Sequence, residues 1–234
     1  MPNLKDRLAA SLMRTLKRQR LAADPIALHV QRLCARLRTV DLGTVPVEQA
    51  PFVVLDTETT GLNPGKDRIV SVGMVKMRSG VIGQRFEALV DPQIPIPLSA
   101  VEIHGISDDM VRGQPTLLER IVDMLDFIGA SVVVGHHIGF DIRFINKAMV
   151  GHLGAHFPYP TLDTMRLDRA LAPCDEVGTL DDVAGRLGIE VHGRHTALGD
   201  AKATASIFWR LAEQARQSRG VTTVEGLFRL QRLG

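Results

Sequence analysis

Two acidic residues at the end of an apolar segment give the first indication of chemistry in this chain. Residues 52–55 are apolar and β-branched, as in a buried strand, and Asp56 and Glu58 follow directly. Because side chains alternate along a strand, both carboxylates are expected on one face. A cation between them would relieve their repulsion, and carboxylate oxygens suit Mg²⁺ or Mn²⁺. Acids at a strand end also occur without a metal, so this pair alone does not decide the function.

Two further sites carry residues of the same chemical kind. Asp141 follows the short apolar segment 131–135 and lies in a helical pattern. His195 and Asp200 are five residues apart, which on an ideal helix separates them by about 140° around the axis. They cannot share a helix face, so we expect His195 on a loop and Asp200 in the first turns of the helix after it. A lone histidine beside an acid is usually a surface pair.

Taken in order, the three sites resemble the motifs of a known family. The segment FVVLDTETTGL resembles the first motif of the DEDD 3′–5′ exonucleases, a group that includes the DnaQ-like proofreading exonucleases of DNA polymerases. The match covers about residues 52–210 and keeps the order and approximate spacing of all three motifs. His195 stands where the sister branch has tyrosine, and the one tyrosine, Tyr159, lies in another segment. The chain is therefore similar to the DEDDh branch.

This resemblance implies a mechanism. Asp56, Glu58, Asp141 and Asp200 would bind two divalent metal ions, Mg²⁺ or Mn²⁺, and His195 would be the general base. The activity would be metal-dependent hydrolysis of phosphodiesters from the 3′ end, with release of nucleoside 5′-monophosphates. The resemblance also implies that substrate is contacted by Thr59, Thr60, Gly61, Leu62, His104, His137 and Phe144.

Some of these residues also fit a purely structural role. Phe144 matches the core face of a helix, and His104 could cap a loop. Many relatives have Asn-Ala where this chain has His137-Ile138, which puts one contact near the second motif in doubt. His137 could substitute for the asparagine as a hydrogen-bonding group.

Composition and charge describe the rest of the chain. With 234 residues, 45% hydrophobic and 23% charged, the chain is expected to be globular and cytoplasmic, without a membrane span or secretory signal. Residues 1–40 carry nine Lys/Arg against two acids, whereas residues 41–234 carry nineteen against twenty-four. A basic arm of this kind is compatible with holding a polyanion. The favoured alternative is that the leucine-rich helices of this arm pack on the body of the protein. A weaker alternative is that the arm is a mitochondrial presequence.

The order of the expected elements predicts an α/β fold. Strands near 52–58, 68–77 and 81–90 are expected, the last two forming a hairpin, and a further strand is expected near 131–135. Ser107-Asp108-Asp109 indicates a helix start, and Thr179 with Asp182 would cap another helix. Helices are expected near 116–129, 164–171, 179–187, 197–217 and 223–232. The resemblance implies a ribonuclease H-like mixed five-stranded sheet flanked by helices.

We expect a basic helical extension at 1–45, an exonuclease domain at 46–217, and a C-terminal helical tail at 218–234. The extension would contain helices at 3–21 and 25–38. Asp24 would cap the second of these, and its apolar face would consist of Ile26, Val30, Leu33 and Leu37.

Two questions of function stay open. The expected partners are the 3′ ends of single-stranded DNA or RNA, and the sequence does not choose between them. The alternative to a free-standing enzyme is a proofreading or accessory subunit, active in DNA repair or replication, that docks onto a DNA polymerase through its terminal helices. A nucleic-acid-binding module without activity is disfavoured because every expected metal ligand is present.

Overall fold

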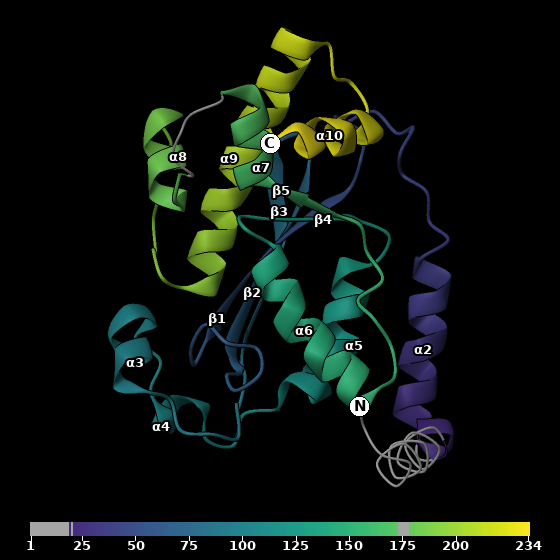
Figure 1. Cartoon of the computed structure of the whole chain (residues 1–234), viewed down its shortest axis with the longest axis vertical. Helices are drawn as coiled ribbons and strands as arrows, with labels where there is room; N and C mark the ends of the chain where they lie inside the picture. The colour runs from purple at the N-terminus through teal and green to yellow at the C-terminus, as the bar shows by residue number, and fades with distance from the viewer. Residues whose placement is uncertain (1–18, 20, 173–177) are drawn as a thin grey trace, which may run out of the picture.

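A mixed five-stranded sheet forms the centre of the structure (Figure 1). The structure is a computed structural model and describes residue 19 and residues 21–172 and 178–234. The strand order is β3-β2-β1-β4-β5. The hairpin strands β2 and β3 are antiparallel to each other, β2 is antiparallel to β1, and β4 and β5 run parallel to β1. The strands are β1 (Phe52–Thr59), β2 (Ile69–Arg78), β3 (Val81–Leu89), β4 (Val132–Gly135) and β5 (Thr161–Asp163). The predicted fold and hairpin are confirmed.

Helices cover both faces of this sheet, because alternate residues of β1 enter two separate apolar cores. Phe52 and Val54 pack with the C-terminal helices, and Val53 and Leu55 pack with the helices of the other face. The first layer contains α7 (Thr164–Leu171), α8 (Leu180–Arg186), α9 (Ala197–Arg219) and α10 (Val224–Leu230), which a 3₁₀ turn (Gln231–Leu233) follows. The second contains α2 (Pro25–Leu37), α5 (Leu117–Ile128) and α6 (Gly139–His152).

Side-chain caps begin most of the helices that the sequence predicted. Thr116 and Thr179 each form a capping box with an acid three residues later, Glu119 in α5 and Asp182 in α8. Two short helices, α3 (Leu98–His104) and α4 (Asp108–Val111), pack through a small apolar cluster beside β2. The sequence indicated the start of α4 but missed α3, which follows Pro97 without a side-chain cap.

The segments that flank the exonuclease motifs pack on the body. Asp24 caps α2 as predicted, but the predicted apolar face is wrong at Ile26, which is 59% exposed; Ala27 takes the buried place beside Val30. The predicted helix at 3–21 lies almost wholly outside the described residues. None of the helices within the described ranges has both the length and the apolar character needed to span a bilayer.

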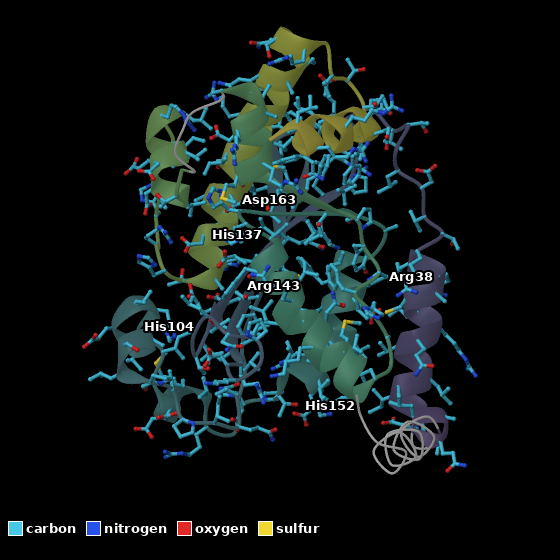
Figure 2. All side chains as sticks on the ribbon, viewed as in Figure 1. Arg38, His104, His137, Arg143, His152 and Asp163 are labelled. Carbon is cyan, nitrogen blue, oxygen red and sulfur yellow. The ribbon has the colours of Figure 1, made fainter. Side chains whose placement is uncertain are left out.

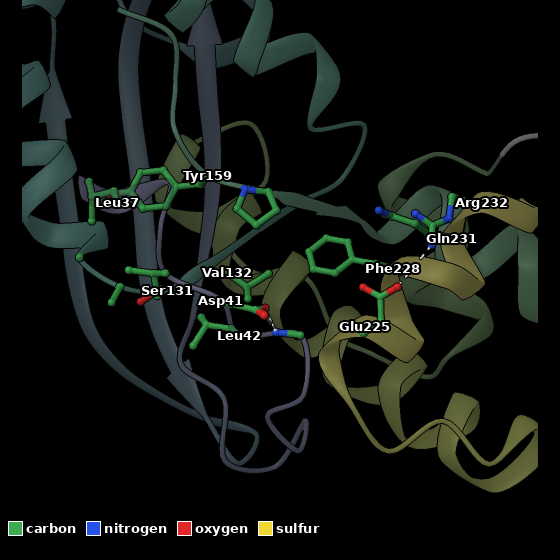
Figure 3. Close-up of a pocket in the computed structure, with 15 residues that line it drawn as sticks. Leu37, Asp41, Leu42, Ser131, Val132, Tyr159, Glu225, Phe228, Gln231 and Arg232 are labelled. Carbon is green, nitrogen blue, oxygen red and sulfur yellow. Dashed lines mark hydrogen bonds and ion pairs between the residues drawn. The ribbon is translucent and has the colours of Figure 1, made fainter. Parts of the chain in front are cut away.

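The C-terminal tail closes one end of the molecule. The backbone of Val224 bonds to Val45, and Val47 bonds to Thr222, so the linker before β1 pairs with the segment leading into α10. A cavity of about 300 Å³ lies where this linker, the start of β4 and α10 meet, with Tyr159 and Phe228 in its wall (Figure 3). Because it adjoins the first residue of β4, this cavity lies at the end of the parallel strands opposite to the acidic residues.

Candidate active site

Three of the predicted acidic residues meet on one face of the sheet. Asp56 and Glu58 project from β1 toward α9, and Asp200 lies in the first turn of that helix. One carboxylate oxygen from each of the three lies within 4.8 Å of the others. Such a group of oxygens can hold a divalent cation.

A glycine in the neighbouring strand allows α9 to come this close. Gly73 pairs with Asp56 across β1 and β2. A Cβ atom on Gly73 would overlap the backbone of Ala197 and Leu198, the first residues of α9. The helix therefore begins in direct contact with the sheet, which brings Asp200 over Asp56.

Asp141 approaches from the opposite face of the sheet. Thr57 lies between Asp56 and Glu58 and points the other way, toward α6, where its hydroxyl donates to Asp141 Oδ1 at 2.5 Å. Asp141 is buried in the first turn of α6, and its charge raises the pKa of Asp56. The fourth carboxylate is therefore adjacent to the group of three but does not belong to it.

His195 precedes α9 in a turn, as its spacing from Asp200 predicted. Its backbone has a φ of 60°, a left-handed conformation that residues other than glycine seldom adopt. The side chain of Thr196 caps α9 by accepting from the N–H of Gly199. Burial raises the pKa of Asp200, and the charge of Arg194 and the nearby backbone N–H of His195 oppose this rise. The His195 side chain itself is exposed.

The electrostatics of the group match its geometry. Burial, and then the charges of Asp141, Asp200 and Glu58, raise the pKa of Asp56 well above its usual range. Burial, with Asp200 adding to it, raises the pKa of Glu58 to about 7. Burial also raises the pKa of Asp141 to about 7, although the hydrogen bond from Thr57 opposes it. Carboxylates with raised pKa values are favourable sites for a cation, which stabilises their charged forms.

The last residue of β1 and the loop after it carry the first group of predicted substrate residues. Thr59 donates to the carbonyl of Gly61, and the buried hydroxyl of Thr60 accepts from Arg68 N–H. A Cβ atom on Gly61 would lie 2.6 Å from an Asp67 oxygen, so packing inside the loop also requires this glycine. Leu62, in contrast, is 83% exposed. The side chain of Leu62 is thus the one most open to a substrate.

The other predicted substrate residues lie in different environments. His104 is buried at the end of α3, where its Nδ1 accepts from the N–H of Ile106, whereas His137 is exposed before α6 (Figure 2). His137 has a φ of 56°, and its backbone N–H donates to Asp163. Phe144 is buried in the core and contacts the ring of Phe140 at 5.0 Å between centroids.

Sequence reasoning missed two residues at the site. Arg194 donates from Nη1 to Asp200 Oδ2 and from Nε to both oxygens of Asp181. Phe140 is only partly buried and lies between His137 and Phe144. The position of Arg194 next to His195 was the available signal, but its partner Asp181 is thirteen residues away.

Comparison with known proteins decides the family. A family model described as "Exonuclease" matches residues 53–208. The chain belongs to the exonuclease family. Among curated relatives of this exonuclease, the DNA polymerase III subunit epsilon of Aquifex aeolicus is 36% identical over 77% of this chain and 90% of its own length. A DNA polymerase III subunit epsilon-like protein of Rhodobacter capsulatus is 40% identical, over 78% of this chain but only 26% of its own length.

A solved structure agrees with this assignment. Exonuclease X in complex with 5′ overhanging duplex DNA is 26% identical, with a TM-score of 0.62 over 77% of this chain and 99% of that one. The predicted resemblance, the ribonuclease H-like fold and the 3′–5′ exonuclease class are thereby confirmed. The chain covers only 11% of a PolC-type DNA polymerase III of Clostridium perfringens, to which it is 40% identical.

Proposed function

We propose that this exonuclease removes nucleotides from the 3′ end of single strands by a two-metal mechanism with His195 as the general base. The observation that carries this proposal is the group formed by Asp56, Glu58 and Asp200, whose ligand oxygens lie within 4.8 Å of one another. His195 lies in the turn before α9, and Asp200 of this group lies in the first turn of that helix. The products would be nucleoside 5′-monophosphates.

The donor set fits a hard divalent ion such as Mg²⁺ or Mn²⁺. The ligands are carboxylates, which are the oxygen donors that these ions prefer. Oδ1 of Asp200 is buried and has no hydrogen-bond partner among the described residues. A buried charged oxygen without a partner is costly, and a cation would supply the missing interaction. Asp56, Glu58 and Asp200 would hold one ion, and Asp56 with Asp141 would support a second.

Each residue has a defined task in the hydrolysis. Bound divalent ions supply Lewis-acid activation of water and neutralise charge on the phosphate. His195 would accept the proton of the attacking water, and its exposed ring can pass that proton to solvent. The amino end of α9 adds a favourable dipole for the negative charge at Asp200.

Two apolar side chains that follow or precede the acidic motifs in sequence, exposed Leu62 and partly buried Phe140, support a site for the terminal bases. Leu62 would insert next to a base, and Phe140 would offer a ring face for stacking. Arg143 lies 5.9 Å from the Phe140 ring and would attract the phosphate backbone of the strand. Both DNA and RNA strands have the required bases and phosphates.

The direct experiment is to follow 3′-labelled single-stranded DNA, RNA and mismatched duplex side by side, with Mg²⁺, Mn²⁺ or EDTA. We expect labelled mononucleotide as the first product with either metal and none with EDTA. Asp200→Ala should abolish this release, whereas Asp109→Asn, at an exposed acid paired with Arg112, should leave it unchanged. Full activity of Asp200→Ala at saturating Mg²⁺ would reject the proposal.

The similarity to an epsilon subunit favours a second candidate, a proofreading or accessory subunit that docks onto a DNA polymerase in the cytoplasm. Mixing the full chain with the polymerase III catalytic subunit of its own source, followed by size-exclusion chromatography, tests this role. Co-elution at a defined ratio would support it. Separate elution at micromolar concentrations would favour a free-standing enzyme.

A further inference from the structure

Arg194 connects two helices across the edge of the carboxylate group. Its Nε donates to Asp181 Oδ1 and Oδ2 at 2.9 and 3.0 Å, and its Nη1 donates to Asp200 Oδ2 at 2.5 Å. Asp181 belongs to α8 and Asp200 to α9. The fork geometry of a guanidinium makes such a link directional, in a way that a lysine ammonium cannot reproduce.

The two oxygens of Asp200 therefore have different environments. Oδ2 is held by Arg194, whereas Oδ1 is buried without a hydrogen-bond partner in the described part of the chain. The side chain of Asp200 is 8% exposed and that of Arg194 is 29% exposed. Rotation of the carboxylate would break a charge-assisted bond, so the arginine determines which oxygen remains free.

The net charge of the link also matters. An unpaired arginine beside the carboxylates would repel an incoming metal ion. Asp181 binds the same guanidinium through both of its oxygens, so the pair adds little net charge to the site. The contribution that remains is orientation.

We propose that Arg194, anchored by Asp181, is a positioning residue that directs Oδ1 of Asp200 toward the divalent metal. This inference rests on the proposed function, because it requires Asp200 to be a metal ligand. Arg194 also precedes His195 directly, and its Nη1 lies 3.4 Å from the Nδ1 of that histidine. The same link therefore restrains the turn that carries the general base. Two of its nitrogens already contact carboxylates, which separates this role from that of an arginine that binds a substrate phosphate.

The test measures Mn²⁺ binding to the full chain by calorimetry. Arg194→Met should weaken binding by about tenfold or more, as is typical when the partner of a metal ligand is lost. Arg194→Lys should recover only part of the loss, and Asp181→Asn should weaken binding in the same direction. The KM for an oligonucleotide should change little in all three variants while kcat falls.

A matched control is available on α8, the helix that carries Asp181. Arg186 of α8 binds the buried Asp168 through its Nη2, in an arginine–aspartate link outside the carboxylate group. Arg186→Met should leave Mn²⁺ affinity unchanged even if it lowers the melting temperature. If Arg194→Met fails to fold, Asp181→Asn carries the test, since the Asp181 side chain is 57% exposed.

The outcomes distinguish a failure of this inference from a failure of the proposed function. The positioning role would be overturned if Arg194→Met bound Mn²⁺ as tightly as the wild type or more tightly. If Arg194→Met does not fold, the same result for Asp181→Asn would overturn it. A raised KM with unchanged Mn²⁺ affinity would also overturn it, in favour of substrate contact. Failure of the wild type to bind Mn²⁺ would instead reject the proposed function itself.

Discussion

At the scale of single residues, the site combines groups that are unfavourable together without a metal. Glu58 and Asp141 have pKa values raised to about 7, and the pKa of Asp56 is also raised well above its usual range. In the unfolded chain, these groups ionise near pH 4. Between about pH 4 and 7 the native protein therefore binds more protons than the unfolded chain, so stability falls as pH rises.

This difference predicts how stability depends on pH. In EDTA, we expect the free energy of unfolding to decrease between pH 5 and 8 by several kcal/mol, because each raised pKa contributes about 1.4 kcal/mol per pH unit over this range. Asp56→Asn should flatten the decrease, and added Mg²⁺ should restore stability above pH 7. Thermal unfolding across this pH range, with and without metal, provides the measurement. A wild-type curve no steeper than that of Asp56→Asn would contradict the assignment of close carboxylates.

His195 gives a prediction of a different kind. Its loss should lower kcat by about 10²–10⁴-fold, the usual contribution of a general base, and should leave Mn²⁺ affinity nearly unchanged. A rise in pH should restore part of the rate of His195→Ala, because at high pH the attacking water loses its proton without the help of a general base. Single-turnover kinetics from pH 6 to 9 measures both effects. Loss of Mn²⁺ binding in this variant would identify His195 as a ligand instead.

Some of these residues could be predicted from the sequence and others could not, for physical reasons. Asp56 and Glu58 were accessible because strand periodicity alone puts them on one face. Arg194 was not, since its role depends on Asp181, which only the tertiary structure brings near. His137 shows a third case. Its φ of 56° is a left-handed conformation that asparagine adopts readily, which agrees with the asparagine that the family resemblance implied at this position.

At the scale of elements, local signals predicted what short-range physics determines. The capping box of α8 and the β2–β3 hairpin were predicted from the residues that form them, whereas α5 was predicted as a helix without its capping box. The three residues of β5 are too few to show a periodic pattern, so only the family resemblance implied a fifth strand. The contact between α9 and the sheet was also missed, because it depends on a glycine that sequence alone does not distinguish.

That contact predicts a sensitive position in β2. Gly73→Ala should force the start of α9 away from the sheet, because the new Cβ would overlap the backbone of Ala197 and Leu198. We expect a loss of about 1–3 kcal/mol in stability. The loss of Mn²⁺ affinity and activity should be larger than unfolding explains, since Asp200 moves with the helix.

A glycine in the adjacent strand is the control. At Gly83 in β3, the nearest atom to an added Cβ is the Lys76 carbonyl oxygen at 3.8 Å. Gly83→Ala should therefore leave activity and metal binding unchanged. Equal metal affinity in the Gly73→Ala and Gly83→Ala proteins would show that the approach of α9 does not position Asp200.

At the scale of the whole molecule, the N-terminal part of the chain is both basic and apolar. Ala27 and Val30 of α2 are fully buried against the helices of one sheet face. We expect deletion of residues 1–42 to lower the melting temperature and solubility, because the apolar surface under α2 becomes exposed. The salt dependence of binding to long strands should not change.

Comparison of full-length and truncated protein separates the two roles of this region. Affinity for a long single strand is measured against salt concentration, together with the mass of each protein in solution. A truncated protein that remains stable and monomeric but has a flatter salt dependence would show that the basic residues hold phosphates.

The most direct test of the central claim is to count the Mn²⁺ ions bound per chain in the presence of a nucleoside 5′-monophosphate, the proposed product. We expect two ions for the wild type and a loss of binding in Asp56→Ala, with the melting temperature in EDTA maintained or raised. Wild-type protein that degrades 3′-labelled strands while it binds no divalent ion, or an Asp56→Ala protein that still binds two, would contradict it.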